Sequence, residues 1–265
     1  MQFAVFRQRM EAAYTPTFKK SFQAQIHQYI TYAEEKGYEQ ATAFINVIVT
    51  GTPLELPLRK LYAECASKWG WKTYRDLPQK GFFQDGIVNR LLASINAYFD
   101  KYILNKVVVE TTDYTRKWMR QQISAGLENG DGYDKIARSM VDSSVNLMRA
   151  KRIARTETVR ASNYASLDAA RLSPLLLKKE WIAAKDNRTR RVPRDTADHL
   201  ALDGITIGLD DWFNEFTTEG VQLLQHPGDI NAGAASTINC RCTLAYVSSR
   251  DNAGRLILNP QNARR

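Results

Sequence analysis

Two cysteines separated by a single residue, Cys240 and Cys242, carry the clearest potential for chemistry in this sequence. On an extended strand their side chains share one face about 6.5 Å apart, whereas a disulfide needs its Cβ atoms about 3.8 Å apart. The spacing therefore argues against a disulfide. Two thiolates on one face can bind a tetrahedral zinc ion if two further ligands are present. The same thiols can also pack as small hydrophobic side chains, and the Cys-x-Cys pattern alone favours packing.

Two of the three histidines of the chain, His199 and His226, are available as the missing zinc ligands. A cysteine nucleophile is a further alternative, with His199 as its base and Asp198 or Asp203 orienting the ring. The spacing does not require that arrangement. The candidate metal ligands are Cys240, Cys242, His199 and His226, with Asp186, Asp195 and Asp229 as carboxylate alternatives.

The stretch "KDNRTRR" has two interpretations. Asp186, Arg188, Arg190 and His199 are groups that a nuclease uses for phosphate binding and proton transfer. A turn is the simpler interpretation, because an aspartate there accepts hydrogen bonds from the following backbone N–H groups. The segment "HPGD" at 226–229 likewise indicates a tight turn.

The net charge of +9 is unevenly distributed. Residues 146–194 carry a net +9, and residues 195–235 carry a net −8 without a single Lys or Arg. The two blocks either neutralise each other in the fold or leave a basic face for phosphates. The second interpretation predicts weak, sequence-independent DNA binding that salt weakens. The expected contacts are Arg149, Lys151, Arg152, Arg155 and Arg160, with Arg188, Arg190 and Arg191 as a second group.

Composition is ordinary for a soluble globular protein, with 44% hydrophobic and 25% charged residues. No apolar run approaches the ~20 residues of a membrane helix, and two early arginines argue against a signal peptide. Three cysteines fit a reducing compartment. We expect neither export nor a membrane partner.

The elements that position the candidate residues follow from periodicity. Apolar residues at helical spacing predict helices through residues 1–110 and three more in 111–174, the last of which has an alanine stripe for close packing. Alternation predicts strands at 178–185, 221–225 and 237–247, the last carrying both cysteines. The sequence therefore predicts an α+β protein, mainly helical first, with a short sheet later. The expected parts are a helical domain (1–110), a helical connector (111–174), an α+β module (175–250) and a basic tail (251–265).

Five motifs in order carry a family resemblance: "RIARTETVRASNYA", "WIAAKDNRTR", "DHLALDG", "HPGD" and "NCRC". Over roughly residues 110–247 the chain resembles the phage head morphogenesis family, the Mu protein F-like minor head proteins. One departure is the longer, more charged segment "RVPRDTAD" before His199. The recurrence of the histidine and cysteine motifs together implies that Cys240 and Cys242 face the loop carrying His199.

The resemblance implies a minor capsid protein of the virion, at or near the portal, acting in capsid assembly, DNA packaging or DNA delivery. Its implied partners are the portal protein, other capsid proteins and DNA, and its implied locations are the virion and, during assembly, the host cytoplasm. It implies no settled enzymatic activity, so catalysis is the less expected role. The alternative is a nuclease or other phosphate-handling enzyme in the α+β module. The aromatic residues of 1–110, including Trp69, Trp71, Phe82 and Phe83, either dock on a virion partner or are buried in the core of that segment.

Overall fold

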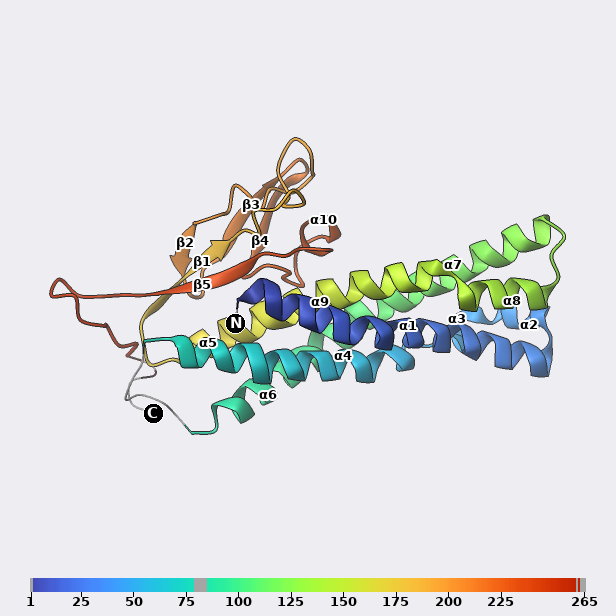
Figure 1. The fold of residues 1–265 in the computed structure, drawn as a ribbon, viewed down its shortest axis with the longest axis horizontal. Coiled ribbons are helices and arrows are strands. Elements are labelled where there is room, and N and C mark those ends of the chain that lie inside the picture. Colours follow the sequence, from blue (N-terminus) through green and yellow to red (C-terminus); the bar gives the residue numbers. More distant parts are fainter. Residues whose placement is uncertain (1, 79–84, 261, 263–265) are drawn as a thin grey trace. The chain divides into compact units, whose positions relative to one another are not determined.

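The computed structural model describes residues 2–78, 85–260 and 262, and it is an α+β protein in which helices precede the strands (Figure 1). The predicted fold class is thereby confirmed. Phe82 and Phe83 lie outside the described residues. Among the residues that are described, no helix combines the length and the apolar character of a membrane span.

Helices make up nearly all of the structure before residue 173. Two stretches, η1 and η2, are π-helical and continue directly into neighbouring α-helices. The helices are α1 (Phe3–Lys36), α2 (Tyr38–Ala43), α3 (Ile45–Ile48), α4 (Thr52–Cys65), η1 (Ala66–Gly70), α5 (Trp71–Asp76), α6 (Ile87–Tyr98), η2 (Phe99–Val108), α7 (Val109–Glu128), α8 (Tyr133–Asp142), α9 (Ser144–Leu172) and the short α10 (Ala234–Thr237).

Five short strands follow α9 and form two antiparallel sheets. One sheet has the order β2-β1-β5, and the other is the hairpin β3–β4. The strands β1, β4 and β5 overlap the predicted ranges and each extends one residue beyond them, whereas the sequence did not indicate β2 and β3. The strands are β1 (Leu177–Ile182), β2 (Thr206–Gly208), β3 (Phe213–Thr217), β4 (Gly220–Leu224) and β5 (Thr243–Ser248).

The chain divides into two compact units, each built from separated segments. Unit 1 contains Met1–Met10, Leu61–Ala97 and Arg155–Arg265, and unit 2 contains Glu11–Lys60 and Tyr98–Ala154. These units cut across the domains expected from the sequence, because their boundaries fall inside the helices α1, α4 and α9.

In unit 2 a buried polar seam runs beside the apolar core. Gln25 Nε2 donates to Thr112 Oγ1 (3.1 Å), and Thr115 Oγ1 donates to Gln25 Oε1 (2.9 Å). Arg149 Nη2 donates to the same threonine hydroxyl (2.6 Å). These polar groups satisfy one another away from water, which makes the seam tolerable in an interior.

A helix start expected at Thr111 or Thr112 is wrong. The backbone is helical without interruption from α6 through η2 into α7, and Val108 already has helical dihedral angles. Thr112 is buried at 2% exposure because it belongs to the polar seam of unit 2 rather than to a helix cap.

In unit 1 the alanine stripe of α9 packs as predicted, since Ala161, Ala165 and Ala169 are all buried. A Cβ placed on Gly70 would lie 3.2 Å from the Ala165 side chain, so small residues on both sides permit this approach. Trp69 is half-buried and stacks on Phe6 at a centroid distance of 5.2 Å. The Trp69 side chain therefore packs against the core of unit 1.

Candidate metal centre and its surrounding loops

Three segments of unit 1 that lie far apart in the sequence meet at one buried cluster. His199 comes from the loop between β1 and β2, Glu215 from β3, and Cys240 and Cys242 from the segment before β5. All four are at most 2% exposed. The two cysteines therefore face the histidine loop, as the family resemblance implied.

The cysteines do not lie on the final strand, which is a correction to the sequence analysis. Strand β5 starts at Thr243, and the preceding residues form the short helix α10 and an irregular segment. Asn239 adopts a left-handed conformation (φ 60) that breaks the extended geometry. Because the segment is not a regular strand, the two sulfur atoms come closer than strand spacing would allow.

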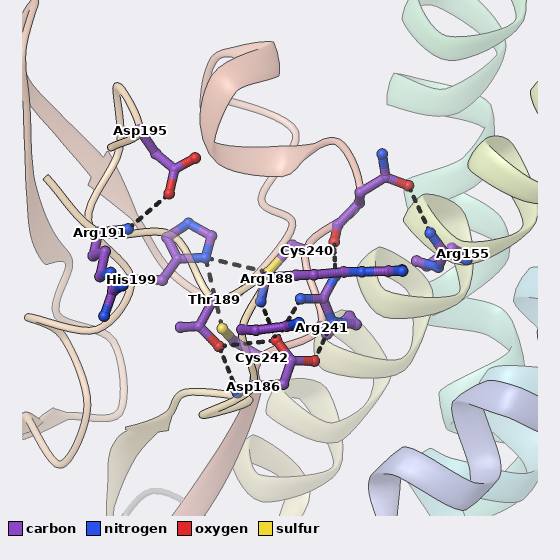
Figure 2. Close-up of polar contacts among 12 residues, drawn as sticks. Arg155, Asp186, Arg188, Thr189, Arg191, Asp195, His199, Cys240, Arg241 and Cys242 are labelled. Atoms are coloured by element: carbon purple, nitrogen blue, oxygen red, sulfur yellow. Dashed lines mark hydrogen bonds and ion pairs between the residues drawn. The ribbon is translucent and has the colours of Figure 1, made fainter. Parts of the chain in front are cut away.

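The Nδ1 atom of His199 lies 3.6 Å from the sulfur of Cys240 and 3.6 Å from that of Cys242 (Figure 2). The three ligand atoms all lie within 4.8 Å of one another, and both cysteines are free thiols. Among the residues that the structure describes, this is the one group of at least three His, Cys, Asp or Glu side chains close enough to hold a metal ion.

The opposite side of the histidine ring contacts a carboxylate that sequence reasoning missed. His199 Nε2 lies 3.0 Å from Glu215 Oε1, a close contact whose angle falls short of a good hydrogen bond. The other carboxylate oxygen accepts a hydrogen bond from the Ser236 hydroxyl. Glu215 is fully buried, and a buried carboxylate is tolerated only when polar groups contact it. Here His199 and Ser236 are those groups.

Backbone pairing explains why His199 and Glu215 meet. Ala197 forms an antiparallel bridge with Thr217 at the end of β3. Continuing that register by two residues on each side places His199 opposite Glu215. Trp181 of β1 closes the cluster, with its ring edge-on to His199 at a centroid distance of 5.3 Å.

Polar residues of α9 hold the cysteine segment from the other side. Thr156 Oγ1 accepts from Asn239 N (3.0 Å), and Asn163 Nδ2 donates to the Cys242 carbonyl (3.1 Å). Asn163 Oδ1 also accepts from Leu244 N (3.2 Å). The first and last of the five motifs are therefore in direct contact.

The segment 226–229 is a buried turn, as predicted, and it also packs on α9. Asp229 carboxylate oxygens accept from Gln225 N (2.8 Å) and Asn231 N (3.0 Å). Arg160 Nε donates to the Gly228 carbonyl (2.9 Å) while its Nη1 pairs with Glu157 (2.7 Å). His226 is not in the cysteine cluster; its Nδ1 lies 3.1 Å from the Pro227 carbonyl oxygen. Its placement as a fourth metal ligand is therefore corrected.

The "KDNRTRR" stretch folds as the turn that the simpler interpretation predicted. Asp186 accepts from Arg188 N (3.0 Å) and from the Thr189 hydroxyl (3.3 Å). It also forms a two-pronged ion pair with Arg241, at 2.6 and 2.8 Å (Figure 2). Hydrogen bonds from Arg241 lower the pKa of Asp186 to about 2. The turn thus ties the "NRTR" motif to the residue between the two cysteines.

Ionisation in the cluster is coupled. A hydrogen bond from Cys242 lowers the pKa of Cys240, and the same contact raises the pKa of Cys242, because one proton between two sulfurs favours a single thiolate. Burial alone would lower the pKa of His199, but the contacts with Cys242 and Glu215 outweigh it and raise that pKa to about 9. Burial lowers the pKa of His226, which keeps that ring neutral.

Two of the eight expected DNA contacts are buried, which corrects their assignment. Arg149 is 7% exposed within the polar seam of unit 2, with its guanidinium 4.1 Å from the Phe22 ring centroid. Arg160 is 6% exposed and paired with Glu157. Arg155 and Arg190 are half-buried and donate to Asn239 Oδ1 and to the Ile238 carbonyl. The exposed members of the set are Lys151, Arg152, Arg188 and Arg191.

Three aspartates of the acidic block (residues 195–235) form ion pairs, but with cations outside the expected DNA-binding set. Asp195 pairs with Arg194, Asp203 with Lys185, and Asp210 with Arg171. None of these three cations belongs to the expected DNA-binding set. Neutralisation and an exposed basic set therefore coexist in this fold.

The geometry does not assemble a nuclease site from the residues considered for one. His199 is directed into the interior toward the cysteines, and Asp186 is committed to Arg241. A cysteine nucleophile must be accessible to its substrate. Cys240 and Cys242 are each only 2% exposed, so a substrate has no direct access to their sulfur atoms. The arrangement is instead that of a buried ligand set with a carboxylate behind the histidine.

In this α+β module, motifs of α9, the "DHLALDG" loop and the cysteine segment contact one another. Residues 117–245 match the family described as Phage Mu protein F like protein. This region of the chain is therefore similar to the Mu protein F-like phage proteins, and the match covers 129 of the 265 residues.

Two curated relatives share this part of the chain. One is the NAD(+)--arginine ADP-ribosyltransferase EFV of Enterococcus faecalis (strain ATCC 700802 / V583), 32% identical over 149 residues that cover 54% of this chain and 28% of the relative. The other is the uncharacterized protein YqbB of Bacillus subtilis (strain 168), 28% identical over 135 residues covering 50% of this chain and 42% of the relative. The chain thus spans less than half the length of each. No solved structure gives a significant match.

Proposed function

We propose that the protein is a minor head component that acts at or near the portal, in capsid assembly, DNA packaging or DNA delivery. The family match over residues 117–245 carries this proposal, because the motifs behind it meet in one compact module. The transferase name of one relative is not extended to this chain, since the matched stretch is only 28% of that protein.

The first test is co-purification from procapsids. The full-length chain should be incorporated when the portal protein is present and lost when the portal gene is deleted. Equal incorporation in both cases would contradict a portal-proximal position. The experiment uses the whole chain because residues 1–100 contribute segments to both units, so their deletion would disrupt folding rather than docking alone.

Docking through the N-terminal helical region is tested with surface variants. Phe44 and Val47 are 49% and 74% exposed, and they are adjacent at the α2–α3 junction. Exposed apolar side chains of this kind are common interface anchors. Replacing both with serine should lower incorporation into procapsids without lowering the melting temperature. A matched double variant at the exposed, polar positions Glu34 and Glu35 should leave incorporation unchanged.

We propose that DNA contacts the exposed cations of the expected set, namely Lys151, Arg152, Arg188 and Arg191. Contacts with phosphates predict an affinity for DNA that depends on salt and not on base sequence. Each phosphate contact adds about 0.9 to the slope of log affinity against log salt. Changing Arg188 and Arg191 to glutamine should therefore reduce the slope by up to about 2. The matched control removes two other exposed arginines that are engaged within the chain, Arg250 (to the Gly254 carbonyl) and Arg255 (to Asp251). Equal losses in both variants would indicate a net-charge effect instead of a contact.

A further inference from the structure

We propose that Cys240, Cys242 and His199 bind one structural zinc ion in unit 1, and that Glu215 positions the histidine for it. This inference goes beyond the proposed role in the phage head and does not depend on it.

The first argument is the spacing of the ligand atoms. A nitrogen about 2.1 Å and a sulfur about 2.3 Å from a zinc ion, at a tetrahedral angle, lie about 3.6 Å apart. The His199 Nδ1 atom lies 3.6 Å from each cysteine sulfur. Two sulfurs on the same ion would lie about 3.8 Å apart, which is inside the 4.8 Å that encloses all three atoms. The two nitrogen–sulfur separations therefore match those of a zinc ligand set, and the sulfur–sulfur separation is compatible with one.

The second argument is the symmetry of the contact. An imidazole nitrogen has either one hydrogen to donate or one lone pair to accept with. Shared between two sulfurs, that single feature forms only a bent three-centre contact, because it can align linearly with one sulfur at a time. In this structure Nδ1 is equally distant from both sulfur atoms. A cation held between the three atoms accounts for this arrangement, whereas simple packing of thiols as hydrophobic groups does not require it.

The third argument concerns Glu215 on the far side of the ring. Zinc-bound histidines commonly present their second nitrogen to a carboxylate, which fixes the ring orientation and tautomer. Glu215 Oε1 lies 3.0 Å from His199 Nε2, and its other oxygen is held by the Ser236 hydroxyl. Burying a charged carboxylate destabilises the fold unless the carboxylate has a polar partner. The His199 ring is such a partner for Glu215, and it would at the same time bind the metal through its other nitrogen.

Three protein ligands leave one tetrahedral position for a solvent-derived ligand. His226 does not supply it, because that ring lies against Pro227 and Tyr164. The ligands are buried and come from segments distant in the sequence, so the ion joins the His199 loop to the start of β5. Zinc that binds only the assembled site contributes its binding energy to folding. We therefore assign it a structural role.

The test measures metal in the full-length chain. Protein purified with added zinc should contain about one zinc per chain, and Co²⁺ should replace it with a thiolate-to-metal charge-transfer absorption and a tetrahedral ligand-field spectrum. Cys240→Ser and Cys242→Ser should lose the zinc and the charge-transfer band. Cys65→Ser is the matched control, because Cys65 is an equally buried free thiol of the helical core. It should keep both.

Glu215→Gln tests the positioning residue. Loss of such an outer-shell carboxylate typically lowers metal affinity about 10- to 100-fold, which is measured by competition with a chelating dye. The cobalt spectrum of the variant should remain that of a two-sulfur site. An unchanged zinc affinity in Glu215→Gln would remove the positioning role.

Two results would overturn the zinc proposal. One is wild-type protein that holds no zinc and gives no charge-transfer band with Co²⁺, a measurement that does not depend on any variant folding. The other is a Cys240→Ser, Cys242→Ser double variant that keeps one zinc per chain, because the metal would then lie elsewhere.

Discussion

Lys179 offers the sharpest test of the energetics of this fold. It occupies the central strand β1 on the same face as Leu177 and Trp181, and it has no exposed surface. Its Nζ has no hydrogen-bond partner and lies 5.5 Å from the Phe213 ring centroid. Burial lowers its pKa from 10.5 to about 8. A buried ammonium group without a partner destabilises the native state.

The magnitude follows from that pKa. Each unit corresponds to 1.36 kcal/mol, so the charged form costs on the order of 3 kcal/mol in the native state. Replacing Lys179 with methionine keeps a similar unbranched shape and removes the charge. We expect the free energy of unfolding at pH 7 to rise by about 1 to 3 kcal/mol, measured by urea denaturation with tryptophan fluorescence.

The pH dependence has a definite sign. Below about pH 8 the lysine is protonated in both states, so its full cost is present. Between about 8 and 10.5 the unfolded chain binds more protons than the native one, and wild-type stability gains relative to the variant. The advantage of Lys179→Met should therefore be largest below pH 8 and vanish near 10.5.

A matched control is the neighbouring Lys178, which is exposed on the other face of β1. Lys178→Met should change the free energy of unfolding at pH 7 by no more than about 0.5 kcal/mol. The reasoning is refuted if Lys179→Met destabilises the protein at pH 7. It is equally refuted if the difference from wild type stays constant up to pH 10.5.

Three further predictions concern unit 1. Gly228→Ala should destabilise by about 2 kcal/mol more than Gly204→Ala in thermal unfolding, since both have φ near +80 but only the first faces the α9 backbone, at 3.2 Å. Glu157→Gln should cost about 3 kcal/mol in urea unfolding, as it leaves a buried guanidinium without its charge partner. Asp186→Asn should flatten the acid limb of stability between about pH 4 and 2, because pairing with Arg241 lowers the aspartate pKa to about 2. That ion pair is partly exposed and is worth no more than about 1 kcal/mol.

The sequence was sufficient for the elements whose patterns are local. Helical periodicity found the N-terminal helices, and the alanine stripe of α9 correctly indicated a buried face. Alternation found β1, β4 and β5. In each case nearest neighbours along the chain determine the structure, so one-dimensional patterns carry the information.

The missed features depend on tertiary contacts. Glu215 lies in the acidic block, and the sequence analysis counted it only as one of the charges of that block. The alternation Phe213, Glu215 and the glycine turn at 218–220 could have indicated a hairpin with that glutamate inward. The segment before β5 has β-favouring composition, but hydrogen bonds from α9 and the left-handed Asn239 override it. Burial of Arg149 also depends on a partner helix, which charge counting does not reveal.

The discontinuous make-up of unit 1 has a consequence for its synthesis on the ribosome. All segments of unit 2 have been translated by residue 154, so that unit can close first. The early segments of unit 1, Met1–Met10 and Leu61–Ala97, must wait for Arg155–Arg265, which includes every strand. At about 5 to 20 residues per second this interval lasts several seconds or more. Throughout it these early segments lack the strands β1–β5 and the part of α9 that complete their unit, although Phe3 and Phe6 can already contact Trp69.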